Sequence, residues 1–218
     1  MEYLRRARYR SLPLSEAARR LASPGELPER SVVITLDDGF RDNYERAFPI
    51  LLGLGFTATV FLTASYIGTD RLPTLTGTDF VPRPLDWGQV KEMHAQGIEF
   101  GSHTLTHPML SRLPLTEARR EIAESRLVIE DRLGAPVRLF CYPRGDFNEG
   151  VKQIVREEGY VAACTTLPGT NDRRTDLLAL RRTYVGRRDT EREFAKKAAG
   201  AYDLLQRSGL LWKHLRAT

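Results

Sequence analysis

The chain has 218 residues, of which 41% are hydrophobic and 28% are charged. This length and composition allow a sizeable buried core, and we expect a single domain. The formal charge of +5 comes from 33 Lys and Arg against 28 Asp and Glu, and the basic residues form no long block. We therefore expect no nucleic-acid partner, and the excess charge favours an anionic surface or polymer.

The cysteine content and the N-terminal residues indicate the cellular compartment of the protein. Cys141 and Cys164 make no disulfide framework and lack metal-site spacing, which is compatible with a reducing compartment. Residues 1–6 lack the apolar region of a signal peptide, and no apolar run is long enough to span a bilayer. A cytoplasmic location without a transmembrane segment is therefore favoured. The oligomeric state stays open.

The predicted elements alternate between strand and helix after a helical start. Residues 2–9 and 15–22 have helical composition, and we expect no strand before either. Strands are predicted at 32–36, 56–62, 98–101, 137–142, 160–165 and 178–185. Helices are predicted at 41–52, 87–96, 116–133, 149–158 and 191–207, and a long loop at 65–84. This alternation, without internal repeats, predicts a parallel barrel or a doubly wound sheet.

Two adjacent carboxylates, Asp37 and Asp38, follow the strand predicted at 32–36. In α/β folds the C-terminal ends of strands bind ligands, because the loops gather there. Neighbouring carboxylates repel, so a partly buried pair usually has a cation or a proton-transfer role. The alternative is that Asp38 caps the following helix. This stretch alone favours neither interpretation.

Two histidines four residues apart, His103 and His107, follow the strand predicted at 98–101. A helical turn between them would bring both imidazoles to one point. Together with the acid pair, they favour a metal site over a chance pair of histidines. Two imidazole nitrogens and one carboxylate suit Zn²⁺ and leave positions for water and substrate. Because Fe(II) oxygen chemistry needs no second acid beside its ligands, the acid pair favours hydrolysis.

Three motifs resemble, in order and type, the first three motifs of the polysaccharide deacetylases, the NodB-homology domains of carbohydrate esterase family four. They are TLDDG at 35–39, GSHTLTH at 101–107 and FCYPRG at 140–145, and the resemblance covers about residues 30–186. It implies an α/β fold of the distorted (β/α)7 barrel type. It also implies that N-acetyl groups are removed from the amino sugars of a polysaccharide or glycoconjugate, with one divalent metal.

The resemblance also assigns roles to single residues. Asp37 looks like the catalytic base, and the backbone N–H of Arg144 falls where the family stabilises the oxyanion. The residues that look like metal ligands are Asp38, His103 and His107. The residues of the third motif expected at the substrate are Tyr142, Pro143 and Gly145. We expect the sugar to lie over the metal, between the 65–84 loop and the turn that ends at Phe147.

Two features depart from the family pattern. The family often has an arginine at the position of Cys141, where it orients the base, so here that support is missing or comes from elsewhere. Residues 142–145 look more like the subgroup that acts on exopolysaccharide such as poly-N-acetylglucosamine. In that subgroup the general-acid histidine lies on a strand before the first helix. Outside the histidine pair this chain has only His94, expected at the surface, and His214, in a short tail.

We therefore expect a domain that starts late, with an incomplete barrel and an open seam beside residues 32–36. The expected division is a helical remnant at 1–29, the deacetylase domain at 30–207 and a tail at 208–218. Two other functions stay open: the same fold and metal acting on a small amide, or a catalytically impaired carbohydrate-binding relative. The intact Asp37 argues against the second, because a structural metal site needs no free base beside it.

Overall fold

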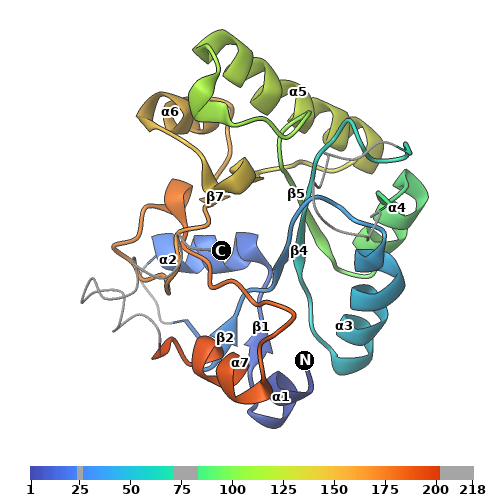
Figure 1. The fold of residues 1–218 in the computed structure, drawn as a ribbon, viewed down its shortest axis with the longest axis vertical. Coiled ribbons are helices and arrows are strands. Elements are labelled where there is room, and N and C mark those ends of the chain that lie inside the picture. The colour runs from blue at the N-terminus through green and yellow to red at the C-terminus, as the bar shows by residue number, and fades with distance from the viewer. Residues whose placement is uncertain (24–26, 71–82, 202–218) are drawn as a thin grey trace.

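The computed structural model describes residues 1–23, 27–70 and 83–201 (Figure 1). Its helices are α1 (Glu2–Arg6), α2 (Leu14–Ala22), α3 (Phe48–Leu54), α4 (Trp87–Ala95), α5 (Leu115–Leu133), α6 (Glu149–Glu157) and α7 (Glu191–Ala198). Its strands are β1 (Arg10–Ser11), β2 (Ser31–Val32), β3 (Thr35–Leu36), β4 (Thr59–Leu62), β5 (Glu99–Ser102), β6 (Leu139–Cys141) and β7 (Ala162–Cys164). Short turns of other helix types are η1 (Asn43–Ala47), η2 (Leu110–Arg112), η3 (Pro143–Gly145) and η4 (Leu177–Ala179).

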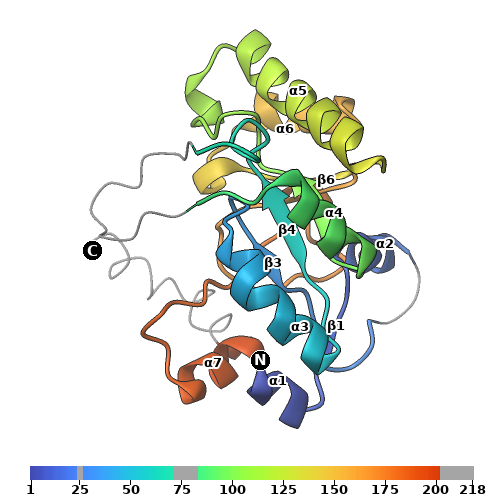
Figure 2. The same cartoon turned by 90° about the vertical axis from the view of Figure 1, so that its right-hand side faces the viewer.

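Five parallel strands form the central sheet in the order β3-β4-β5-β6-β7, so each strand pairs with the next one along the chain. A doubly wound sheet would reverse its strand order at a switch point, and this sheet does not. It curls into a half-barrel, with helices α3 to α6 around it (Figures 1 and 2). The expected incomplete (β/α)7 barrel is confirmed. All five strands end at the same edge, where their following loops meet.

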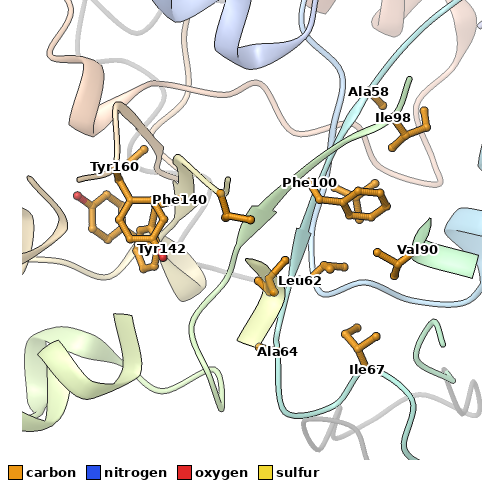
Figure 3. Packing of buried hydrophobic residues seen from close by; sticks show 14 of the residues in the cluster. Ala58, Leu62, Ala64, Ile67, Val90, Ile98, Phe100, Phe140, Tyr142 and Tyr160 are labelled. Atoms are coloured by element: carbon orange, nitrogen blue, oxygen red, sulfur yellow. The ribbon is translucent and has the colours of Figure 1, made fainter. Parts of the chain in front are cut away.

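Successive side chains of each strand point to opposite faces of the sheet, so the half-barrel has two apolar cores, one on each face. One set of side chains points outward and packs beneath the surrounding helices; Figure 3 shows Phe100, Phe140, Tyr142 and Tyr160 among this cluster. The other set points inward, including Phe61 from β4 and Cys141 from β6, and α2 packs against it. Successive strand residues face opposite sides, so burial on both faces produces the continuous apolar runs seen in the sequence.

Helix ends agree with the capping residues in the sequence. Asp86 accepts a hydrogen bond from Gln89 N–H in a capping box at the start of α4. Asn148 and Thr190 cap α6 and α7, each accepting from the N–H of the third residue of its helix, and Thr190 also forms a capping box with Glu193. Gly134 ends α5 in the left-handed conformation, with φ of 71°. These predicted boundaries are confirmed.

The N-terminal region corrects the expectation of a helical segment without a strand. β1 lies between α1 and α2 and pairs in parallel with β2. Its two residues, Arg10 and Ser11, are too few and too polar to show a strand period. The strand predicted at 32–36 is divided into two strands. Its first part belongs to β2, which pairs with β1, and its second part is β3, which pairs with β4. Within the described residues the other edge of β3 carries no strand.

Other boundaries also differ from the prediction. The predicted helix at 41–52 begins as the π-helical turn η1, since Pro49 has no N–H to bond the preceding turn. The strand predicted at 178–185 is absent: η4 occupies its start, and Leu180 alone makes a bridge, to Cys164. Helix α7 ends at Ala198, and the last residues of the helix predicted at 191–207 lie outside the described residues. Most of the predicted 65–84 loop and the 208–218 tail lie outside the described residues.

No helix within the described ranges is both long and apolar enough to cross a membrane.

Candidate metal centre and active site

The ends of β3 and β5 bring three of the predicted residues to one point. Asp38 Oδ1 lies 3.6 Å from His103 Nε2 and 3.4 Å from His107 Nε2. These three atoms all lie within 4.8 Å of one another, which is close enough to share a metal ion. Asp38 Oδ1 is buried and has no hydrogen-bond partner among the described residues. A buried carboxylate oxygen without a donor is costly, and a cation at this point would satisfy it.

Both imidazoles are arranged to offer a lone pair to a cation. His103 Nδ1 lies 2.6 Å from the carbonyl oxygen of Cys141, so this nitrogen carries the proton and Nε2 faces Asp38 unprotonated. Burial lowers the pKa of His103 and of His107, and the charge of Arg144 lowers the pKa of His107 further. Neutral imidazoles form no salt bridge with Asp38. The donor set of two nitrogens and one carboxylate oxygen therefore fits a divalent cation such as Zn²⁺.

Backbone strain is concentrated around this point. Six non-glycine residues of the described chain have positive φ, and four of them surround the site: Asp38, Thr104, His107 and Arg144, with φ between 56° and 71°. Each such residue costs on the order of 1 kcal/mol, which the surrounding structure must offset. Around His103 and His107, the hydroxyl of Thr104 accepts from His107 N–H at 2.9 Å. Buried Glu121 on α5 accepts from Leu105 N–H at 2.9 Å.

Asp37 is held by Arg182, a residue that the sequence analysis missed. Nη1 and Nη2 of Arg182 lie 2.6 and 2.8 Å from the two carboxylate oxygens of Asp37. Burial by itself raises the pKa of Asp37, but the hydrogen bonds and the charge of Arg182, together with the nearby Cys141, bring the pKa below its usual value. Asp37 is therefore ionised at neutral pH. The family often has an arginine at the position of Cys141. In this chain Arg182, from a later segment, holds Asp37 instead.

The sequence carries one weak signal for Arg182. It lies in the stretch 178–185, for which the sequence predicts a strand, and a charged side chain in a buried strand requires a partner. The sequence of this stretch does not indicate which carboxylate pairs with Arg182. A second group of possible ligands, Asp37, His103 and Cys141, also lies within 4.8 Å. Since Arg182 already pairs with Asp37 and its Nη2 is 3.2 Å from Cys141 Sγ, the group around Asp38 is the better cation site.

The turn after β6 buries two of the three residues that its motif predicts at the substrate. Tyr142 and Pro143 are expected to contact substrate, yet both side chains are buried, and the Tyr142 hydroxyl donates to Leu178 O at 3.0 Å. Burial also raises the pKa of Tyr142. Gly145 has φ of 68°, and a Cβ there would lie 2.7 Å from Thr166 N, so this glycine permits a close backbone approach. The three residues shape the turn, and their contact with substrate stays a prediction.

Arg144 lies near enough to the candidate cation site for its charge to lower the pKa of His107. It has left-handed backbone geometry, with φ of 56°, and its side chain is exposed. The neighbouring N–H groups of the turn donate to carbonyls of Tyr142 and Pro143. Within the described chain, the Arg144 N–H donates to no backbone carbonyl, so it is available to an incoming oxygen atom. The other described histidine, His94, is exposed on α4, as predicted, and His214 lies outside the described residues.

Comparison with known proteins agrees with this geometry. The polysaccharide deacetylase family model matches residues 25–163. The chain is 31% identical over 185 residues to YxkH of Bacillus subtilis (strain 168), covering 85% of this chain and 62% of that protein. It is 26% identical over 144 residues to the poly-beta-1,6-N-acetyl-D-glucosamine N-deacetylase of Staphylococcus aureus (strain MRSA252), covering 62% and 47% of the two chains.

The solved structure of IcaB from Ammonifex degensii is similar in fold. It superposes with a TM-score of 0.78 at 27% identity, over 92% of this chain and 85% of that one. The chain spans about three fifths of YxkH and about half of the staphylococcal enzyme. The family match covers more than half of the chain, including the acid pair and both histidines. The chain therefore belongs to the polysaccharide deacetylase family.

Proposed function

We propose that the chain is a metal-dependent deacetylase that removes N-acetyl groups from the amino sugars of a polysaccharide. The observation that carries this proposal is the placement of Asp37. It is ionised, held by Arg182, and next in sequence to a carboxylate that shares a cation site with two neutral histidines. A cation site that served structure alone would need no ionised carboxylate beside it.

Asp38, His103 and His107 would hold the cation, which when bound would supply Lewis acidity toward water and the acetamido carbonyl. Asp37 accepts the proton that the attacking water loses, because Arg182 keeps it ionised. The Arg144 N–H donates to the carbonyl oxygen as negative charge develops on it. The C–N bond then breaks to give acetate and a free amine, and the amine must gain a proton from a further donor.

Two findings support the glycan as substrate. The family match and the named activity of the staphylococcal relative both agree with a polymer of amino sugars. The experiment is acetate release from β-1,6-linked N-acetylglucosamine oligomers by the zinc-loaded chain. Chelation should abolish release and added Zn²⁺ should restore it. Asp37→Asn should also abolish release, whereas Asp131→Asn, the same change at an exposed position on α5, should not.

The same assay separates the other candidate functions. Equal rates on the oligomers and on a small acetamide would indicate a small-amide enzyme. Binding of oligomers with no release of acetate from any substrate would contradict the deacetylase and indicate a carbohydrate-binding relative.

A further inference from the structure

Asp146 joins the loop after β5 to the turn after β6. Its Oδ2 accepts a hydrogen bond from the Ser111 N–H at 2.8 Å, and its Oδ1 accepts one from the Ser111 hydroxyl at 2.7 Å. Ser111 lies in η2, four residues after His107, and Asp146 directly follows η3, two residues after Arg144. The two bonds therefore connect the segment that carries a proposed cation ligand with the segment that carries the proposed oxyanion donor.

This link restricts direction as well as distance. Hydrogen bonds to a carboxylate are charge-assisted and roughly twice as strong as bonds between neutral groups. Both acceptor oxygens belong to one planar group, and both donors belong to one residue. Ser111 and Asp146 therefore cannot rotate relative to each other without breaking one of the bonds. Both residues are partly buried, which limits competition from water.

The Arg144 peptide is held on another side by the loop after β7. Thr166 Oγ1 donates to the carbonyl oxygen of Arg144 at 3.2 Å. Gly145 also approaches this loop closely, since a Cβ on it would lie 2.7 Å from Thr166 N. These contacts place the Arg144 peptide relative to β7, and they do not reach the loop after β5. The bonds between Asp146 and Ser111 provide the connection to that loop.

A cation and an oxyanion donor that act on one carbonyl oxygen must keep a fixed separation. His107 and the Arg144 N–H both lie beyond the ends of their strands, and β5 pairs with β6 at one position, Ser102 with Phe140. Strand pairing therefore gives little control over how the two loops sit. An oxyanion donor works at about 2.7–3.1 Å from the oxygen, so a small displacement of either loop weakens its bond.

We propose that Asp146 is a positioning residue, which sets the Arg144 N–H relative to the cation site through its two bonds to Ser111. The inference rests on the proposed deacetylase function. Ser111 engages both carboxylate oxygens of Asp146, so the effect of Asp146 passes through the backbone of the turn. The bond from the Arg144 N–H strengthens as negative charge develops on the carbonyl oxygen. Its displacement therefore lowers kcat and leaves KM unchanged.

The experiment compares Asp146→Ala with Asp131→Ala, the same change at an exposed position on α5, in the zinc-loaded full chain. Asp146→Ala should lower kcat for N-acetylglucosamine oligomers by about 10-fold, less than the roughly 100-fold or more that complete loss of an oxyanion donor costs. KM and zinc affinity should be unchanged. Asp131→Ala should match the wild type. Asp146→Asn keeps one acceptor oxygen for Ser111, so its kcat should lie between those of Asp146→Ala and the wild type.

The affinity for a tetrahedral analogue separates a displaced donor from a general loss of structure. The probe is an oligomer in which one acetyl group is replaced by a methylphosphonyl group, whose charged oxygen stands where the oxyanion forms. Its Kd should rise about 10-fold in Asp146→Ala, in step with the fall in kcat. Ser111→Ala removes one of the two bonds and should change both quantities less.

Wild-type kcat and Kd in Asp146→Ala would overturn the proposal. So would a rise in KM without a change in analogue affinity, or a loss of zinc that parallels the loss of turnover. If Asp146→Ala does not fold, Asp146→Asn and Ser111→Ala decide, by the same parallel change in kcat and Kd.

A wild-type chain that binds zinc and releases no acetate would contradict the proposed function, and the link between the loops would then be tested by itself. Hydrogen–deuterium exchange of the zinc-free chain measures it. Asp146→Ala should speed exchange in peptides that cover 104–112 and 142–148, relative to Asp131→Ala. Unchanged exchange in both peptides would show that Asp146 does not hold the two loops together.

Discussion

Glu121, in the middle of α5, holds Thr106 at the turn that carries the two histidines. Its carboxylate accepts hydrogen bonds from the Thr106 N–H at 2.8 Å and from the Thr106 hydroxyl at 2.7 Å. Glu121 is only 5% exposed, and a buried carboxylate is tolerated when several donors satisfy it. The helix therefore fixes a strained turn whose residues Thr104 and His107 both have positive φ.

The first prediction concerns this anchor. Glu121→Gln keeps the shape of the side chain but turns an NH₂ group toward some of the donors. Zinc affinity should fall by about 10-fold to 100-fold, as when a residue that orients metal ligands is lost. The free energy of unfolding should fall by about 2 kcal/mol because a buried, charge-assisted bond is lost. Competition with a chelating dye and urea unfolding measure the two effects.

The matched control is Glu124→Gln, one turn further along α5 at an exposed position. It should change neither quantity. Wild-type zinc affinity in Glu121→Gln would show that the histidine turn does not depend on this carboxylate.

The second prediction concerns the ligands and the base. Alanine at any of Asp38, His103 or His107 should remove stoichiometric zinc, because three protein ligands are the minimum for such a site. Asp37→Asn should keep the zinc and stop turnover. Elemental analysis of the purified variants and the acetate assay measure both. Zinc retained in His103→Ala and His107→Ala would disprove the ligand assignment, and turnover by Asp37→Asn would disprove the base.

The third prediction concerns the two thiols. Burial raises the pKa of Cys164 to about 12 and raises the pKa of Cys141 well above its usual value. Because the thiolate is the reactive form, neither thiol should react with Ellman's reagent at pH 8 while the protein is folded. Both cysteines should react after unfolding in guanidinium chloride. Rapid labelling of folded protein, compared with free cysteine as the reference, would contradict the buried placement of these strands.

The fourth prediction concerns stability at low pH. Burial tends to raise the pKa of Asp176, but its bonds to Leu178 N–H and to Lys152 bring it below the usual value of 3.8. A group with a lowered folded pKa stabilises the protein above its unfolded pKa and loses that effect as pH falls through the folded value. The side chain is 44% exposed, so solvent screening limits the effect to about 1 kcal/mol.

Asp176→Asn should therefore lower the free energy of unfolding at pH 7 and have little effect near pH 2. Denaturant unfolding at both pH values measures this difference. Asp131→Asn, at an exposed position on α5, is the control and should be neutral at both. An equal loss at pH 7 and pH 2 would show that the charge of Asp176 plays no part.

The sequence alone predicted the α/β fold class and the three residues that we propose as cation ligands. Alternating apolar runs predicted a parallel α/β domain, and Asp38, His103 and His107 each sit directly after a predicted strand or a few residues beyond it. These signals are local. A strand end followed by an acid or a histidine is visible in a short window, and parallel strands bring their ends to one edge wherever they pair.

The tertiary structure alone decided what holds these residues in place. Arg182 is 145 positions from Asp37, and Glu121 is 15 positions from Thr106 on a different element. Two-residue strands such as β1 also depend on tertiary contacts, because they are too short to show a period. Such contacts arise from how the half-barrel curls and closes. No local pattern encodes that geometry, so the support of the base and of the histidine turn became visible only in the folded chain.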